Sequence, residues 1–287
     1  MDDKTIKLTI IILDFMKARR LVEGVKFLME QETNFNLKII VIDNSCNNEN
    51  AGILREGLGK YPNIELVINE KNSGYPKAHN DVKDRIEGEY VMILNPDILL
   101  KEKTTLTEMV AKMEADPEIG ILGPKQVDDN GNVAMSVRAF PNFFLQVSRR
   151  TFLRNLPVLK GKVAYDEMRH LDYSQTQDVD WLQSSCVLIR RDLWEKVGGF
   201  NDGYFLFMAD VEICLKAWQN GYRVVYYPEA QVYADGKRVS AGGFGAFFKN
   251  WVLRQHVKDS LRYSLAHLLS SDPRKKYYAM KAEHGNR

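Results

Sequence analysis

Several features that would assign this chain to a common protein class are missing from its sequence. Its three cysteines, Cys46, Cys186 and Cys214, are widely spaced and form neither a zinc pattern nor a disulfide framework, which suits a reducing cytoplasm. The net charge is only +2, so composition indicates no nucleic-acid partner. No window holds about 18 uncharged apolar residues, and the first residues lead directly into a predicted strand, so we expect neither a membrane span nor a signal peptide.

Two glycine-rich phosphate-binding patterns are also absent. The first predicted strand is not followed by G-x-G-x-x-G, and G-x-x-x-x-G-K-[ST] occurs nowhere in the chain. The sequence therefore argues against a dinucleotide-dependent oxidoreductase and against a P-loop enzyme. Apolar residues make up 45% of the chain, which is ample for a core.

Apolar runs alternate with helical patterns through the first hundred residues. The predicted strands are 8–13, 37–42, 64–68 and 90–94, and the predicted helices lie at 18–29, 53–58 and 76–86. Such alternation predicts a doubly wound, mostly parallel sheet with helices on both faces. Further on, the sequence predicts a helix after Thr104, strands at 119–122 and 186–189, a hairpin turn at 128–131 and a helix from about 205. Residues 143–162 fit an acceptor-binding or membrane-facing loop and a buried connection equally well.

A polar cluster ends each strand of the first half. The clusters are Asp14, residues 43–45 (Asp-Asn-Ser), residues 72–74 (Asn-Ser-Gly) and residues 95–97 (Asn-Pro-Asp). Parallel strands end at one edge of a sheet, and open α/β sheets bind ligands there. Acidic side chains at that edge suit a nucleotide, with one carboxylate left to hold a metal on the diphosphate. The alternative, that these loops are polar only for solubility, remains open.

Residues 8–97 resemble the donor half of the inverting family 2 glycosyltransferases, which have the GT-A fold, and most of all the bacterial rhamnosyltransferase-type members. The resemblance rests on four motifs in order, at 14–16 (Asp-Phe-Met), 42–45 (Ile-Asp-Asn-Ser), 72–80 (Asn-Ser-Gly-Tyr-Pro-Lys-Ala-His-Asn) and 94–97 (Leu-Asn-Pro-Asp). It implies that Asp43 contacts the base of a nucleotide-sugar. It also implies a nucleotide pocket that includes Asp14, Asn72, Gly74 and Asn80. Asn95 and Asp97 take the family's Asp-x-Asp positions, with Asp97 the ligand for Mg²⁺ or Mn²⁺.

The second half resembles the same family at residues 197–200 (Val-Gly-Gly-Phe) and 205–212. The resemblance implies that Asp210 is the catalytic base and that Trp181 and Glu212 lie on the acceptor side. A carboxylate in the first turn of a helix is stabilised by the helix dipole, so we expect Asp210 to be ionised. The same dipole favours any N-terminal Asp, so a purely structural interpretation stays open.

Two departures from the family pattern affect the metal more than the fold. Ala209 stands where relatives carry an acid, and residues 232–238 contain no His. Asp235, or the pair Lys237 and Arg238, would then replace the missing His, or the diphosphate is held differently.

The sequence changes character after residue 236 and predicts a helical extension. Leucines and a valine share one face of a predicted helix, and Pro273 precedes a basic, aromatic tail. The helix could pack on its own domain, pair two subunits as a homodimer or lie on anionic lipid. We favour packing for the helix and weak membrane contact for the tail.

The resemblance implies a GT-A domain at 1–235, with a donor half (1–100) and an acceptor half (101–235), followed by an extension at 236–287. It implies transfer with inversion, assisted by a divalent metal, from dTDP-rhamnose or a UDP-hexose to a hydroxyl of a glycan or lipid-linked acceptor in cell-surface polysaccharide synthesis. The enzyme would be cytoplasmic or peripheral on the inner face of the membrane. One alternative is a sugar nucleotidyltransferase, although residues 13–20 lack the glycines expected of it. A catalytically inactive nucleotide-sugar-binding scaffold is the other, motivated by Ala209 and the missing His.

Overall fold

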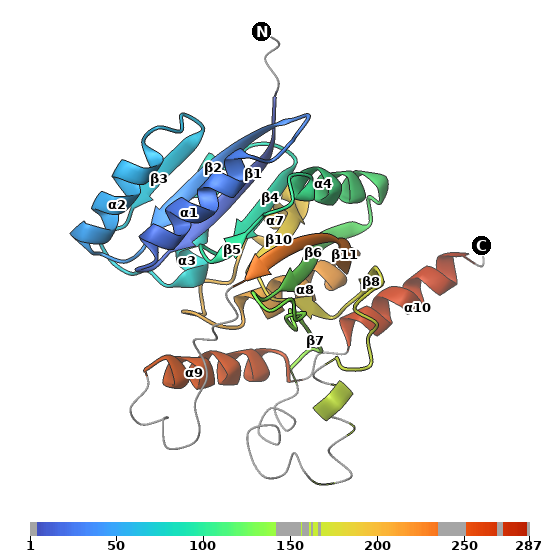
Figure 1. The fold of residues 1–287 in the computed structure, drawn as a ribbon. Helices are drawn as coiled ribbons and strands as arrows, with labels where there is room; N and C mark the ends of the chain where they lie inside the picture. The colour runs from blue at the N-terminus through green and yellow to red at the C-terminus, as the bar shows by residue number, and fades with distance from the viewer. Residues whose placement is uncertain are drawn as a thin grey trace.

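The fold is built on a central sheet with helices around it (Figure 1). The computed structural model describes residues 5–141, 156, 161, 163–165, 168–234, 251–268 and 272–285. Four parallel strands form the first half in the order β3-β2-β1-β4. Their bounds are β1 Ile6–Asp14, β2 Asn36–Asp43, β3 Ile64–Ile68 and β4 Tyr90–Leu94. The connecting helices are α1 Ala18–Met29, α2 Asn48–Leu58 and α3 Tyr75–Asn80. These elements confirm the alternation predicted from the sequence.

The second half of the sheet includes strands that run against the others. β10 (Cys186–Arg190) lies antiparallel between β4 and β6 (Ile119–Val127), and β11 (Arg223–Ala234) is parallel to β6. The remaining strands are β5 Ile98–Leu99 and β8 Gln177–Asp178, both antiparallel to β11, and the separate pair β7 Val137–Arg138 and β9 Trp181–Leu182. The helices of this half are α4 Thr105–Ala115, α7 Arg191–Val197 and α8 Ala209–Gln219. The sheet is thus mostly parallel, but it is not the uniformly wound sheet that the first half suggests.

Three local predictions meet different outcomes. The helix at 76–86 is shorter than predicted, because α3 ends at Asn80 and a 3-10 turn, η1 (Lys83–Arg85), follows. The basic, aromatic tail predicted after Pro273 is itself helical: Pro273 begins α10 (Pro273–Gly285), where its missing N–H has no intrahelical partner to lose. The predicted turn at 128–131 is confirmed, since the N–H of Gly131 donates to the carbonyl of Asp128 at 2.9 Å.

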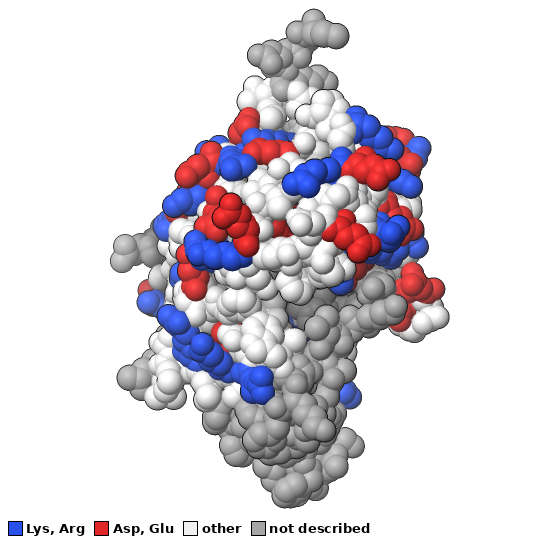
Figure 2. All heavy atoms as spheres, turned by 90° about the vertical axis from the view of Figure 1, so that its left-hand side faces the viewer, with Lys and Arg blue, Asp and Glu red and all other residues white. Residues whose placement is uncertain are grey.

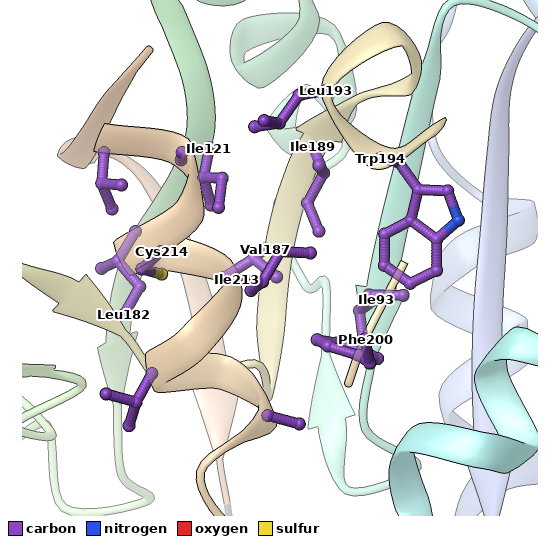
Figure 3. Close-up of a cluster of buried hydrophobic side chains, with 14 of the residues drawn as sticks. Ile93, Ile121, Leu182, Val187, Ile189, Leu193, Trp194, Phe200, Ile213 and Cys214 are labelled. Atoms are coloured by element: carbon purple, nitrogen blue, oxygen red, sulfur yellow. The ribbon is translucent and has the colours of Figure 1, made fainter. Parts of the chain in front are cut away.

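The core beneath α8 fixes that helix to the sheet. On α8, the side chain of Ile213 lies beside Val187 of β10, and that of Cys214 lies toward Leu182 of β9, as Figure 3 shows. All four side chains are at most 3% exposed. Burial of one large apolar side chain contributes about 1.5–3 kcal/mol to the stability of the fold. These contacts therefore hold α8, including its first turn, firmly against the sheet.

Two C-terminal helices, α9 (Trp251–Ala266) and α10, complete the described chain. Tyr277 of α10 packs its ring 5.2 Å from that of Trp218 and donates to Glu118 at 3.0 Å, so the tail is partly buried against α8. Among the described residues, no helix is both long and apolar enough to cross a membrane. The domain boundary expected at 235/236, the substitutes Asp235, Lys237 and Arg238, and nearly all of 143–162 lie outside the described residues.

Candidate functional site at the sheet edge

An acidic pair at the carboxyl ends of β1 and β2 is joined by one amide. Nδ2 of Asn50 donates to Asp14 at 2.6 Å and to Asp43 at 3.1 Å. Oδ1 of Asp43 also accepts the N–H of Ser45 at 3.0 Å, but Oδ2 is buried without a hydrogen-bond partner among the described residues. Buried polar atoms in folded proteins are almost always paired. This oxygen therefore fits an N–H donor supplied by a ligand.

Lys17 connects this pair to the carboxylate assigned to the metal. The backbone N–H of Lys17 donates to Oδ1 of Asp14 at 3.0 Å, while its side-chain Nζ donates to Oδ2 of Asp97 at 2.7 Å. Burial raises the pKa of Asp14, although the hydrogen bond from Asn50 opposes the shift. The side chain of Asp97 is 16% exposed, and the described residues contain no group of three or more potential His, Cys, Asp or Glu metal ligands. A carboxylate beside substrate phosphates suits Mg²⁺ or Mn²⁺ in donor type, but Lys17 has to release Asp97 first.

The loop before α3 is folded by asparagine side chains. Oδ1 of Asn72 accepts from Nδ2 of Asn44 and from the N–H of Gly74, both at 2.9 Å. Gly74 has φ +84°, and a Cβ there would lie 2.6 Å from the carbonyl oxygen of Phe205. That same oxygen accepts the N–H of Tyr75 at 2.7 Å. Only glycine fits this contact, which ties the donor loop to the segment that leads into α8.

Asn80 faces that segment with both ends of its amide. Its Nδ2 donates to the carbonyl of Phe200 at 2.7 Å, and its Oδ1 accepts the N–H of Phe200 at 3.0 Å. Nδ2 also contacts Asp202. The family resemblance implies that Asn80 lines the nucleotide pocket; in the structure its amide also holds the loop after Gly199.

Asp210 lies in the first turn of α8, directly after a residue with a strained backbone and a buried alanine. Met208 has φ +70°, which is strained for a non-glycine residue, and Ala209 is 1% exposed. Burial raises the pKa of Asp210 to about 6, against the opposing effect of backbone N–H groups of Val211, Asp210 and Ser184. The helix dipole argument expected a firmly ionised carboxylate. Desolvation outweighs it here and places the titration close to neutrality, where a general base works best.

Unlike Asp210, Glu212 has its carboxylate occupied by side-chain hydrogen bonds within the protein. It is 5% exposed and accepts hydrogen bonds from Tyr204, from Asn201 at 2.7 Å and from His267 at 3.4 Å. Burial opposes its ionisation, but these hydrogen bonds prevail and hold the pKa of Glu212 below its usual range. Both oxygens are occupied, so the structure gives Glu212 no free atom for an acceptor. Trp181, assigned to the same side, is half-buried and donates from Nε1 to the carbonyl of Ala139 at 2.8 Å.

The segment before β10 joins the two halves of the site. The N–H of Asn95 donates to the carbonyl of Ser185 at 2.8 Å, which anchors the loop that carries Asp97. Ser184 next to it contacts the Tyr75 hydroxyl at 2.9 Å and supplies a backbone N–H toward Asp210. The acidic pair, Asp97 and Asp210 therefore belong to one connected edge.

Sequence reasoning missed several residues of this edge. Lys17, Asn50 and Ser184 carry no motif of their own. Asn50 did give a local signal, since it lies in the first turn of a helix capped by Asn47, whose side chain accepts the N–H of Asn50 at 2.9 Å. The described chain also has a hollow of about 570 Å³, but it lies at the amino ends of the strands, beside Lys7 and Gly88, and contains none of these residues.

Comparison with known proteins places this chain among glycosyltransferases. The Escherichia coli rhamnosyltransferase WbbL is 26% identical over 235 residues, which cover 79% of this chain and 81% of WbbL. The Mycobacterium tuberculosis N-acetylglucosaminyl-diphospho-decaprenol L-rhamnosyltransferase is 28% identical over 207 residues, 68% of this chain but only 66% of the relative.

Solved structures show the GT-A fold. The Pyrobaculum calidifontis mannosyltransferase PcManGT, in complex with GDP-Man and Mn²⁺, gives a TM-score of 0.58 at 18% identity and covers 99% of this chain and 76% of that one. Residues 1–349 of S. aureus TarS with UDP-GlcNAc give 0.57 at 19% identity, covering 83% and 62%. The family model described as glycosyltransferase-like family 2 matches residues 7–250. The chain therefore belongs to glycosyltransferase-like family 2.

Proposed function

We propose that this protein transfers a sugar, with inversion, from a nucleotide-diphospho-sugar to an acceptor hydroxyl. The observation that carries the proposal is the placement of three different carboxylates along one connected sheet edge. Asp43 offers an unsatisfied buried oxygen, Asp97 pairs with a lysine, and Asp210 has its pKa raised to about 6. These are the groups needed to grip a base, to meet a diphosphate and to remove a proton.

The reaction divides these roles between the two halves. Oδ2 of Asp43 accepts an N–H of the base, with Asp14 and Asn50 fixing its orientation. Asp210 takes the proton of the acceptor hydroxyl, whose oxygen then attacks the anomeric carbon from the face opposite the departing diphosphate. A divalent cation held by Asp97 supplies charge neutralisation for the leaving group when bound. Lys17, once released from Asp97, offers its ammonium to the same phosphates.

The relatives support a choice of donor and acceptor. Two of them are named as rhamnosyltransferases, and one of these acts on a decaprenol-linked diphosphate sugar. We infer a dTDP-rhamnose donor first and a UDP-hexose second, with a glycan or lipid-linked acceptor used in cell-surface polysaccharide synthesis. The protein would then work in the cytoplasm, at the inner face of the membrane. A homodimer stays a prediction from the sequence.

A product analysis tests this function against its two alternatives. Purified protein is incubated with each nucleotide-sugar and a soluble acceptor analogue, and the anomeric configuration of the product is read by NMR. Inverted product with release of nucleoside diphosphate supports the proposal. Pyrophosphate release from a nucleoside triphosphate and a sugar phosphate would instead show a nucleotidyltransferase. Tight donor binding without turnover of any acceptor would show an inactive scaffold.

Removal of the Asp97 carboxylate should uncouple nucleotide from metal. We expect Asp97→Ala to lose the gain in nucleoside-diphosphate affinity that Mn²⁺ gives the unchanged protein, while the fold survives. Lys17→Met should have the opposite effect and bind Mn²⁺ more tightly, because the competing ammonium 2.7 Å from Asp97 is gone. Calorimetric titrations with and without Mn²⁺ measure both variants. An unchanged metal response in Asp97→Ala would show that the assignment is wrong.

Membrane contact should depend on the solvent-exposed lysines of α10. Lys275 and Lys276 are exposed, whereas Tyr277 is 3% exposed, so a charge reversal is cleaner than truncation before Pro273. We expect Lys275→Glu/Lys276→Glu to lower binding to anionic vesicles by roughly tenfold or more, with the difference vanishing at high salt.

Reversal of two exposed lysines in the donor half, Lys71 and Lys83, serves as the control for the membrane test. Figure 2 shows another face of the molecule, the left-hand side of Figure 1, where charges of both signs are interspersed above and Lys and Arg side chains gather lower down. Because lysines are exposed on other faces too, the control shows whether a loss of binding is specific to α10. Equal vesicle binding by all three proteins would contradict membrane contact through α10.

A further inference from the structure

One buried carboxylate of α9 lies outside the site as described so far. Asp259 is 1% exposed and accepts the backbone N–H groups of three consecutive residues. Its Oδ1 lies 3.3 Å from the nitrogen of Phe205, and its Oδ2 lies 3.1 Å from that of Leu206 and 3.0 Å from that of Phe207. Gln255, one turn earlier, donates to Oδ1 at 2.8 Å and holds the carboxylate in place.

Three consecutive N–H groups that point at one anion require an unusual backbone. Such concave runs of amides bind anions, and hydrogen bonds to a charged acceptor are roughly twice as strong as neutral ones. The bound segment ends at Met208, whose φ of +70° is costly unless its surroundings enforce it. Asp259 supplies that enforcement directly before α8 begins.

The segment held by Asp259 reaches both halves of the active site. On one side, the carbonyl oxygen of Phe205 accepts the N–H of Tyr75 and lies against Gly74 in the donor loop. On the other side, Phe207 is followed after two residues by Asp210. A shift of this backbone would therefore move the proposed base and loosen the donor loop together.

Other contacts of α9 fall on the same loop. Arg262 donates to the carbonyl of Gly203 at 2.6 Å, and the ring of His256 lies 4.6 Å from that of Phe207. His267, just beyond the helix, reaches Glu212 at 3.4 Å. The contacts span residues 203–212, so α9 and the residue just after it pack along the segment that contains Asp210.

We propose that Asp259 is a positioning residue for catalysis, which holds residues 205–207 so that Asp210 and the donor loop keep their geometry. α9 is then a working part of the catalytic domain and not a separable extension. This inference rests on the proposed function for its catalytic half. Its structural half, the hold on three amides, is independent of any reaction.

The test compares Asp259→Asn with a variant that is destabilised elsewhere. Asn keeps the size of the side chain but removes the charge and turns one acceptor into a donor. Thr9→Val is the matched control, because Thr9 is 0% exposed and exchanges two hydrogen bonds with residue 87 at the far end of β1. Amide hydrogen exchange of residues 205–207, kcat, donor KM and the pH profile of kcat are measured for both variants and for the unchanged protein.

We expect Asp259→Asn to lose exchange protection at residues 205–207 and to lower kcat by about 10²-fold, the typical loss for a small misplacement of reacting groups. The acid midpoint of its kcat profile should also fall below that of the unchanged protein, because a loosened segment lets water reach Asp210. Thr9→Val should lower thermal stability without either change. Preserved protection, or a loss of kcat no larger than that of Thr9→Val, overturns the proposal. Failure of the unchanged protein to transfer any sugar counts against the proposed function alone, because exchange still reports on the hold by Asp259.

Discussion

Asp210→Asn is expected to lower kcat by about 10²–10⁴-fold while donor affinity stays nearly unchanged. The amide keeps the size of the carboxylate and can still accept the N–H of Val211, which lies 3.0 Å from Oδ1. It cannot take a proton, and the base acts on the acceptor hydroxyl rather than on the nucleotide. Steady-state kinetics at saturating donor, with calorimetry for nucleotide binding, separate the two quantities.

Glu212→Gln is the matched control, since Glu212 is two residues away on the same helix. Its hydrogen bonds join α8 to Asn201, Tyr204 and His267, so its loss should lower thermal stability more than kcat. If Glu212→Gln abolished transfer while Asp210→Asn retained it, the roles of the two acids would be the reverse of those proposed.

The same carboxylate should set the acid limb of the pH profile. With a pKa of about 6, Asp210 is protonated at low pH, so kcat should rise as pH increases through that value and then level off. The effect of pH on the stability of the folded protein has the opposite sign. Because the folded pKa lies above the ordinary value of 3.8, the native state binds the proton more tightly than the unfolded state, and stability falls as pH rises from about 3.8 to 6. Asp210→Asn should therefore melt at a higher temperature than the unchanged protein at neutral pH.

Asp43→Asn is the second large effect, and it should appear in binding rather than turnover. A hydrogen bond to a charged acceptor contributes about 1.5–3 kcal/mol, so donor affinity should fall roughly 10–150-fold. The kcat at saturating donor should change little, because Asp43 lies at the base and not at the anomeric carbon. Titration with nucleoside diphosphate measures the loss.

Asp128→Asn makes the same chemical change far from the site and serves as the control. Asp128 accepts N–H groups of Asn130 and Asn132 in the exposed turn after β6, at 2.9 and 2.8 Å. Nucleotide affinity should be unchanged in this variant. If Asp43→Asn also bound nucleoside diphosphate normally, with its melting temperature preserved, then Oδ2 of Asp43 does not meet the base.

Local sequence signals were sufficient for the first half of the fold. Strand β3 has the bounds predicted, and the polar clusters after β1, β2 and β4 do lie along one edge, because parallel strands leave no other choice. The reversed β10 was not predictable, since its five apolar residues carry no information about strand direction.

The residues that were missed depend on distant partners. Lys17 meets Asp97 from 80 residues away, and Asp259 meets Phe207 from 52 residues away. The helix pattern places Asp259 opposite the predicted apolar face, whose Leu261 and Leu265 are in fact exposed, so nothing local indicated that Asp259 is buried. The same limit affected Asn80 and Glu212, whose motif positions were matched while their hydrogen-bonding atoms faced the loop at 200–204.

The hold of Asp259 on residues 205–207 also has a consequence for synthesis of the chain. The chain is synthesised from its amino end, so the strands of the sheet and α8 leave the ribosome before α9 does. Until residue 259 has left the ribosome, three amides ahead of α8 lack their acceptor. If the nucleotide edge forms at that stage, residues 205–207 are not yet held in place. We therefore expect full activity only after α9 has packed against this segment.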